Sequence, residues 1–298
     1  MPIIDLSELP VPQIIEEPDF EVILEDTKES MIAAFPQTQQ AAVRSALALE
    51  SEPLTVIAQV FAFRELLLRQ RINEGAAACM LSHATGDDLD NLAANMNTAR
   101  LVITPATDTT EAVLEDDTAL RLRAQSAFDG LSVAGPTGAY EYFARSASGH
   151  VADARASSPA PAEVVVAVLS TEGDGTADAA LLATVTAALS AEDVRPVGDR
   201  LTVQAAEIVR YRIEARLFFY PGPESEPVLN AAESSLNTWL GEQGRIGKDV
   251  ARSAIMAALH VQGVQRVELV QPAADIVISD TQAAYCEGSA ITEGGRNE

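Results

Sequence analysis

The stretch HATGDDLDNLAANM at residues 83–96 places three aspartates beside a glycine, a pattern that could form a cation-binding loop or a catalytic carboxylate cluster. A calcium loop of the EF-hand type needs oxygen ligands at alternating positions, a glycine at the sixth and a glutamate at the twelfth. Counted from Asp88, those two positions hold Ala93 and Ala99. The calcium-loop pattern therefore fails.

The same stretch fits a boundary between two helices. Gly86 suits the left-handed position that ends one helix, and Asp87 suits the N-cap of the next, with Asp90 three residues further on. Apolar residues then recur at the spacing of one helix face, at Leu89, Leu92, Ala93 and Met96. We therefore predict that Gly86, Asp87 and Asp90 cap helices and hold no metal.

Other residue types that carry chemistry are scarce and scattered. The histidines and cysteines are His83, His150, His260, Cys79 and Cys286. None of them has metal-ligand spacing, and no zinc-protease, nucleophile-elbow, phosphate-loop or dinucleotide-binding motif is present. Acidic runs at 16–17 and 115–117 could support acid–base chemistry, but such runs more often form solvated faces or helix caps. We predict no catalytic, cofactor-binding or metal-binding residues, and hence no enzyme.

The composition excludes two classes of partner. The chain of 298 residues has a net charge of −24, so it offers no basic stripe to a nucleic acid. Its N-terminus lacks the pattern of a signal peptide, and no apolar run approaches the ~20 residues that span a bilayer. We expect no nucleic-acid or membrane partner, and synthesis and assembly in a cytoplasm.

The elements that must position any functional surface begin with a long helix predicted over residues 53–81. It carries two apolar stripes, one at Leu54, Ile57, Phe61, Leu68, Ile72 and Cys79, and another at Val56, Val60, Phe63 and Leu67. A helix of about 28 residues spans roughly 42 Å. Two stripes indicate more than one packing neighbour, which predicts a helical bundle shared between chains. The predicted interface residues are Leu54, Ile57, Phe61, Phe63, Leu67, Leu68 and Ile72.

The whole chain predicts an α+β fold, in which an N-terminal helical bundle segment precedes two small mixed α/β domains. Residues 1–36 are acidic and proline-punctuated, which predicts an extended arm that is either ordered on a partner or disordered. Residues 37–100 form the helical core-bundle region in this interpretation. A middle α+β domain then spans 101–198, and a C-terminal α+β domain with a frayed tail spans 199–298.

A long strand is predicted over residues 208–220, because apolar and charged residues alternate. Its buried face is expected to hold Val209, Tyr211, Ile213, Ala215, Leu217 and Phe219. Arg210, Arg212 and Arg216 lie on the opposite face, with Glu214 among them. These arginines predict either an interface with an acidic partner surface or a solvated face with internal ion pairs.

Taken together, the segments resemble a known family. The run FRELLLRQRINEGAAACMLSHATGDDLDNLA is similar to the signature of phage baseplate J-like proteins. Further matches follow in order: EDDTALRLRAQSAF, AGPTGAYEYFA, the strand before STEGDG, RPVGDRLTV and IGKDVARSAIMAALHVQGVQRVEL. The resemblance extends from about residue 36 to about residue 280.

This resemblance implies a structural role in the baseplate wedge of a contractile tail. In such proteins a second copy of the chain and a tail-protein-I-like partner share a core helical bundle, and the wedges close into a ring around the central spike hub. A lysozyme-like baseplate protein joins the wedge to the sheath or hub. The expected location is the baseplate of a virion or of a phage tail-like bacteriocin. The alternatives are a tail-associated hydrolase and a receptor-binding tail protein.

Overall fold

The computed structural model describes residues 6, 9–10, 12–107, 109–131, 135–192, 194–220 and 226–296. These residues form two compact units, one holding residues 2–95 and the other residues 96–298. Helices dominate the first unit and small sheets covered by helices make up the second, so the fold is α+β, as the sequence predicts.

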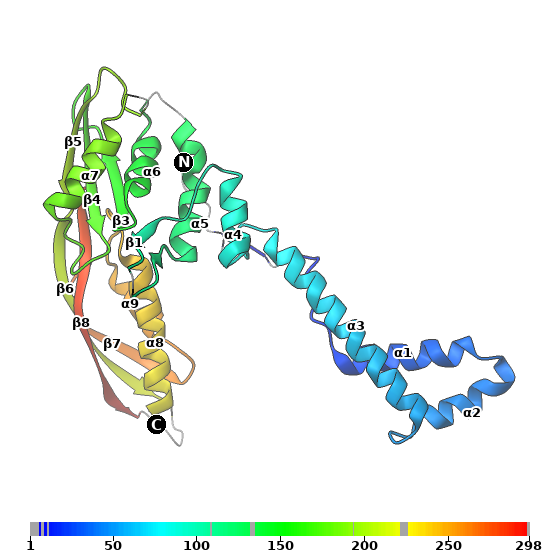
Figure 1. Cartoon of the computed structure of the whole chain (residues 1–298). Helices are drawn as coiled ribbons and strands as arrows, with labels where there is room; N and C mark the ends of the chain where they lie inside the picture. Colours follow the sequence, from blue (N-terminus) through cyan, green and yellow to red (C-terminus); the bar gives the residue numbers. More distant parts are fainter. Residues whose placement is uncertain are drawn as a thin grey trace. The chain divides into compact units, whose positions relative to one another are not determined.

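The first unit is helical (Figure 1). Its helices are α1 (Phe20–Ala34), α2 (Gln37–Leu47), α3 (Pro53–Ala78) and α4 (Gly86–Ala94). Pro53 stands at the first position of α3, where a residue without a backbone N–H costs nothing. Helices α1 and α2 pack on α3 through an apolar cluster formed by Ile23, Leu24, Ile32, Leu47, Ala58 and Ala62.

The prediction of an extended arm over residues 1–36 is wrong for residues 20–34, which form the helix α1. The Asp19 carboxylate accepts hydrogen bonds from the amides of Glu21 and Val22, which satisfies two of the free donors at the helix start. The apolar side chains within the acidic sequence then pack against α3. Residues 1–5, 7–8 and 11 of the predicted arm lie outside the described part of the chain.

The segment before α1 is attached to α3 by one buried amide. Asn73 accepts a hydrogen bond from the Glu16 amide at 3.1 Å and donates another to the Glu16 carbonyl at 2.7 Å. Both backbone groups of one residue are thereby satisfied by one side chain. This pairing sets the point at which the acidic segment meets α3.

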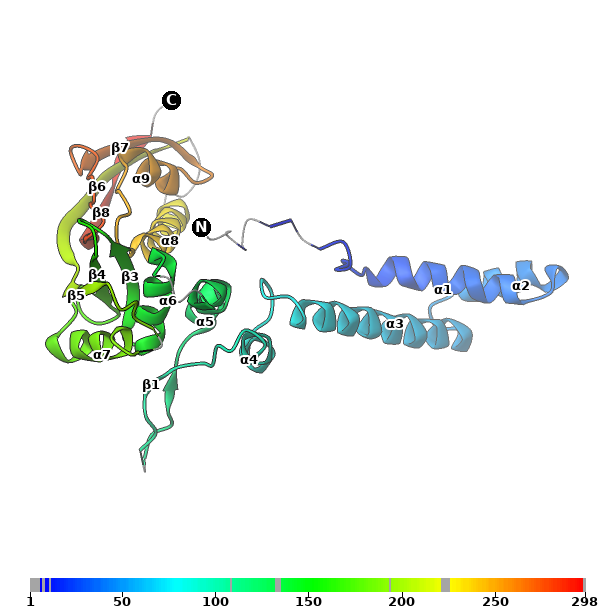
Figure 2. The ribbon, with the colours of Figure 1, turned by 90° about the horizontal axis from the view of Figure 1, so that it is seen from above.

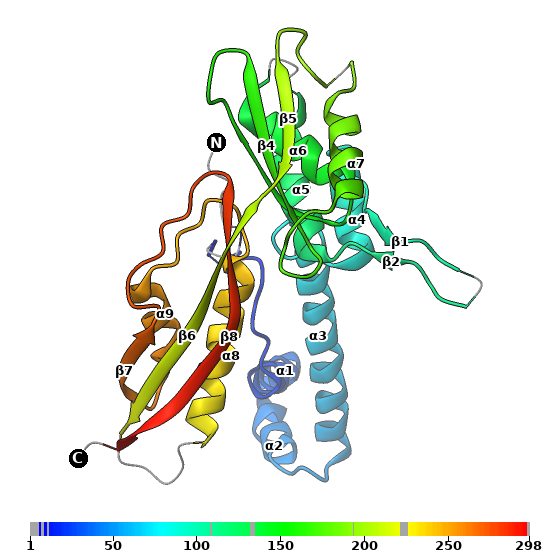
Figure 3. The same ribbon diagram turned by 90° about the vertical axis from the view of Figure 1, so that its left-hand side faces the viewer.

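The second unit holds three small sheets (Figure 3). Its helical elements are α5 (Asp117–Ser126), a 3-10 turn (Ala127–Leu131), α6 (Thr137–Ala147), α7 (Ala179–Leu189), α8 (Glu226–Gln243) and α9 (Arg252–Leu259). Its strands are β1 (Val102–Thr104), β2 (Val113–Leu114), β3 (Val151–Ser157), β4 (Glu163–Ser170), β5 (Arg200–Ala205), β6 (Glu207–Phe219), β7 (Val264–Gln271) and β8 (Gln282–Arg296).

The middle sheet has the strand order β3-β4-β5, with β3 antiparallel and β5 parallel to β4. Helices α6 and α7 cover one face, where Tyr140, Ala144, Val185 and Leu189 meet the strand residues. The predicted boundary at 198/199 is therefore misplaced, because β5 completes the middle sheet through its pairing with β4. The change of sheet comes after Ala205.

The C-terminal sheet has the order β7-β6-β8, and helices α8 and α9 cover one face. Strand β6 shows the predicted alternation, because Tyr211, Ile213, Ala215, Leu217 and Phe219 are buried among the helices. The predicted frayed tail is wrong as far as Arg296, since β8 runs parallel to β6 and ends there. Residues 297–298 lie outside the described residues.

The middle and C-terminal sheets are joined through the second face of β4. Ala167 and Leu169 point away from α6 and α7 and pack with Ala206, Ile246 and Ala283. Strand β4 is thus buried on both faces, which explains its nearly continuous apolar sequence. The Asp153 carboxylate also accepts a hydrogen bond from the Ile246 amide at 3.0 Å.

The hairpin of β1 and β2 projects from this unit (Figure 2) and is held at its base by a buried ion pair. The Arg123 guanidinium donates to the two Glu115 carboxylate oxygens at 2.8 and 2.6 Å, and both side chains are only 6% exposed. Arg123 also donates to the Ala99 carbonyl, and Glu115 accepts from the Leu101 amide. The network therefore clamps both ends of the hairpin onto α5.

We expect Arg123→Met to destabilise this unit by about 3–5 kcal/mol, because Glu115 would remain buried without its counter-charge. The matched control is Arg200→Met at an exposed position of the same unit, which should change stability by less than about 0.5 kcal/mol. Urea unfolding followed by circular dichroism measures both. Equal midpoints for the two variants would show that the pair contributes nothing.

Candidate functional site

Helix α3 has three distinct faces, of which its own unit covers one. Thr55, Ala58, Ala62 and Asn73 are buried, and they recur at helical spacing on the side that meets α1. Figure 2 shows α1 running alongside α3. The alanines allow the two helices to approach closely, because a methyl side chain is small and does not hold the two backbones apart.

The predicted interface residues lie on the other two faces. Ile57, Phe61, Phe63, Leu67, Leu68 and Ile72 are between 48% and 65% exposed in the single chain. Val56 and Val60 extend the second stripe and are exposed as well. Leu54 differs from the rest, since it is partly buried at the edge of the α1–α3 cluster. So many large apolar side chains in water on one helix mark an interaction surface.

The buried face of α3 was not recognised from the sequence. Its small and polar residues, Thr55, Ala58, Ala62 and Asn73, carry little hydrophobic signal compared with the phenylalanines and leucines beside them. The sequence did contain one signal of this contact, because Ala58 and Ala62 are spaced four residues apart on a long helix. The largest apolar residues of α3 thus face solvent, whereas its smallest form the intrachain contact.

Charged residues follow the same division of faces. At 3.6 residues per turn, Arg64 and Arg71 fall between the two apolar stripes. Arg71 pairs with Glu74 at 3.1 Å, and both side chains are exposed. Arg69 instead faces the α1 side, where it pairs with Glu65 at 2.7 Å and Glu16 at 3.5 Å. The two stripes are therefore separate surfaces with a basic line between them.

The aspartate-rich stretch forms a helix start, but with different roles from those predicted. Helix α3 ends at Ala78, so Gly86 does not terminate it, although Gly86 has the expected left-handed conformation with φ of 54°. The N-cap of α4 is Thr85 rather than Asp87, which lies in the first turn, and Asp90 lies inside the helix. The carboxylates of Asp87 and Asp88 in the first turn still stabilise the helix through its dipole. Within the described residues, no group of three or more His, Cys, Asp or Glu could hold a metal ion.

The arginine face of β6 is partly neutralised within the chain. Arg210 pairs with Asp174, whose pKa is lowered by the Thr176 hydroxyl and amide as well as by Arg210. Arg210 and Arg212 both approach Glu287 of the neighbouring strand β8, at 3.7 and 3.2 Å. The structure thus contains the internal ion pairs that were one of the two alternatives for this face. Both arginines also remain exposed, so their guanidinium groups are accessible to a partner.

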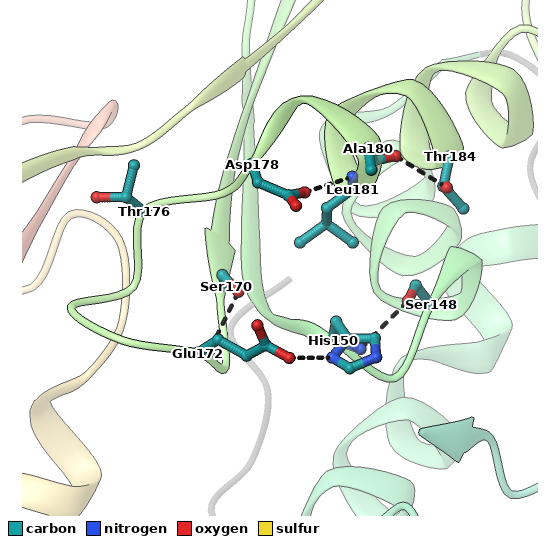
Figure 4. Close-up of a pocket in the computed structure, with 9 residues that line it drawn as sticks. All are labelled: Ser148, His150, Ser170, Glu172, Thr176, Asp178, Ala180, Leu181 and Thr184. Atoms are coloured by element: carbon teal, nitrogen blue, oxygen red, sulfur yellow. Dashed lines mark hydrogen bonds and ion pairs between the residues drawn. The ribbon is translucent and has the colours of Figure 1, made fainter. Parts of the chain in front are cut away.

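A pocket of about 280 Å³ beside α7 gathers several polar groups of the types found in reactive centres (Figure 4). His150 Nδ1 lies 3.2 Å from a Glu172 oxygen. The Ser148 hydroxyl accepts from the His150 amide, and the Ser170 hydroxyl accepts from the Glu172 amide. Asp178 caps α7 by accepting from the Leu181 amide. These contacts close local turns and a helix start, and neither serine is bonded to the imidazole as a nucleophile would be.

Comparison with known proteins identifies the family. Three family models match in order: the Baseplate J-like N-terminal domain at residues 50–107, the Baseplate J-like central domain at 132–205 and the Baseplate J-like protein C-terminal domain at 211–291. The chain is also 55% identical to Baseplate protein J of Escherichia phage P2 over the full length of both proteins. The chain belongs to the baseplate J-like family.

Membership of this family makes the chain a structural protein of a phage baseplate and not an enzyme. The central model ends at residue 205, which is also where β5 ends and the middle sheet is complete. The N-terminal model includes all of α3, so the exposed apolar stripes lie in a part of the chain that the family shares. Among the described residues, no helix is both long enough and apolar enough to cross a membrane.

One half-buried carboxylate in the second unit, that of Glu141, offers a pH-dependent test of the packing around β3. Burial raises the pKa of Glu141, although the Ala156 amide and Arg145 favour its charged form. The ionised side chain is therefore penalised in the folded protein at neutral pH, and the penalty disappears once the carboxyl is protonated.

We expect Glu141→Gln to raise stability at pH 7, because glutamine can still accept from the Ala156 amide without carrying a partly desolvated charge. The gain should shrink as the pH falls toward ~4.3, where unperturbed glutamate is half protonated. Urea unfolding at several pH values measures this difference. A gain that is absent at pH 7, or constant with pH, would contradict the assignment.

Proposed function

We propose that the chain is a wedge component of the baseplate, in which α3 joins a core helical bundle with a second copy of the chain and a tail-protein-I-like partner. The observation that carries this proposal is the pair of exposed apolar stripes on α3. A helix with two such stripes and one covered face has room for two further helical neighbours.

The exposed side chains have a strong reason to be covered. Full burial of a leucine, isoleucine or phenylalanine side chain contributes ~1.5–3 kcal/mol. Covering even half of each of the six exposed residues in the predicted set is therefore worth several kcal/mol. Separate stripes, divided by Arg64 and Arg71, favour two different contacts over one broad one. This matches a bundle in which two copies of one chain take non-equivalent places beside a third chain.

The further partners are proposed from the family resemblance. A lysozyme-like baseplate protein, the sheath and the spike hub are expected to contact the ring that the wedges form. The particle is either a phage tail or a phage tail-like bacteriocin, assembled in the bacterial cytoplasm. The receptor-binding alternative predicted trimeric β-repeats, whereas the described strands form sheets of two and three strands.

Phe61→Asp should leave the isolated chain folded, because Phe61 is 60% exposed, and should abolish wedge formation by burying an unpaired charge in the bundle. Leu49→Asp is the matched control: Leu49 is 59% exposed but lies in the turn before α3 and outside both stripes. Co-expression with the tail-protein-I-like partner and native mass measurement test both variants. Complexes at wild-type yield with Phe61→Asp would exclude this face from the bundle.

We also propose that the arginine face of β6 contacts an acidic surface of a neighbouring wedge. The chain has a net charge of −24, so every neighbouring copy offers acidic residues that the exposed arginines of one sheet face can contact. The pairs with Glu287 and Asp174 orient Arg210 and Arg212 without burying them. Oriented, accessible guanidinium groups are suited to bidentate contacts with carboxylates.

Reversal of both charges, in the variant Arg210→Glu/Arg212→Glu, should keep the domain folded and impair ring closure, with the larger effect at low ionic strength, where repulsion is least screened. Glu287→Gln is the informative control, because it removes the pairs that both arginines make with Glu287, leaves the Arg210–Asp174 pair in place and keeps both arginines. Electron microscopy of tails counts intact baseplates. Equal damage from Glu287→Gln would assign these arginines to internal pairing instead.

A further inference from the structure

A second pocket, of about 290 Å³, lies in the unit of residues 96–298 where α6 and β3 meet the connection between α8 and α9. Its lining is polar and combines residues of the middle and C-terminal parts: Glu141, Arg145, Asp153, Ala154, Arg155, Arg245, Ile246, Gly247 and Lys248. None of the residues predicted from the sequence to be functional lies in this pocket.

Positive charge exceeds negative charge around this pocket. Four lining residues are basic and two are acidic. Asp280, outside the lining, pairs with Arg155 at 2.8 Å, which still leaves the group with an excess of one positive charge. Within the described residues, neither Arg245 nor Lys248 has a carboxylate partner, and the Lys248 ammonium donates only to the Glu242 carbonyl and approaches the Gln243 amide. On a chain of net charge −24, this concentration of cations is unusual.

The pocket also contains a buried basic group whose hydrogen bonds are incomplete. The Arg145 side chain is 10% exposed and reaches Asp153 only at 3.4 Å. Its Nε has no hydrogen-bond acceptor among the described residues. A buried donor without an acceptor is costly, so this N–H needs an acceptor that enters the pocket, either water or a polar group of a ligand.

The residues that line the pocket are held in place by contacts within the chain, before any ligand binds. Gly247 has a φ of 74°, and a Cβ there would lie 3.2 Å from the Arg155 guanidinium carbon, so this guanidinium packs directly on the glycine backbone. Asp280 holds Arg155 from the other side, and Asp153 holds the Ile246 amide. Arg245 and Lys248 are therefore presented by a chain segment whose backbone is already ordered.

We propose that this pocket binds an oxyanion, a carboxylate or phosphate group, through Arg245, Lys248 and the buried Arg145, which line it together. Charge-assisted hydrogen bonds from guanidinium and ammonium groups are the strongest that such a group can receive. The bound group bridges α6 and β3 to the connection between α8 and α9, so it stabilises the junction of the middle and C-terminal sheets. This proposal is independent of the bundle contacts of α3. The oxyanion comes either from solution or from an acidic side chain of a neighbouring baseplate chain.

The first test uses the purified full-length chain and two probes, inorganic phosphate and acetate, in calorimetric titrations at constant ionic strength. We expect saturable binding at one site per chain, weakened at least about tenfold in the variant Arg245→Gln/Lys248→Gln, which removes two charge-assisted contacts. Arg200→Gln, an exposed arginine on the same unit, should bind as the wild type does. No saturable binding of either probe, or binding unchanged in the double variant, overturns the proposal.

The second test separates the two sources of the oxyanion. Lysine occurs only at positions 28 and 248, so a carbodiimide that couples amines to carboxylates reports on Lys248 with Lys28 as the internal reference. A cross-link from Lys248 to another chain, found in assembled tails and absent from the isolated chain, identifies a neighbour's carboxylate. Phosphate binding without that cross-link identifies a free anion. Phosphate binding that persists after the double substitution would place the anion elsewhere and reject this pocket.

Discussion

The close packing of α1 on the alanine face of α3 is the contact on which the helical unit depends. Ala58 and Ala62 have no exposed surface there, and Asn73 satisfies both backbone groups of Glu16 beside them. Because the contact uses the smallest side chains of α3, its largest apolar side chains remain in water. A helix of 26 residues thus has one covered face and two uncovered ones, and we interpret that imbalance as the physical basis of assembly.

In the second unit, the strand β4 is buried on both faces. Val166 and Val168 point to α6 and α7, whereas Ala167 and Leu169 point to Ile246 and Ala283. One strand therefore contributes to two cores, and the middle and C-terminal sheets form one compact unit instead of two separate domains joined by a linker. A buried polar contact reinforces this junction, because Asp153 accepts a hydrogen bond from the Ile246 amide. A separate buried pair, between Arg123 and Glu115, holds the hairpin on α5.

The errors of the sequence predictions have separate physical causes. The acidic, proline-punctuated N-terminus predicted an arm, but a good N-cap at Asp19 and a complementary face on α3 make residues 20–34 helical. The domain boundary was placed too early because β5 pairs with β4, whose residues lie 37 positions earlier in the sequence. Thr85 and not Asp87 is the N-cap of α4 because the helix begins at Gly86, before the residue at which the sequence pattern placed its start.

By itself, the sequence determined the properties that follow from local pattern: the start of α3 at Pro53, its two apolar stripes, the alternation along β6, and the family, whose motifs are spread along the chain in a specific order. Tertiary structure alone decided which face of α3 is buried, because a face of alanines has almost no hydrophobic signal until another helix approaches it. It also decided the parallel pairing of β8 with β6 and the basic pocket of Arg145, Arg245 and Lys248. Those features join residues separated by 70 or more positions in the chain, so no spacing in the sequence announces them.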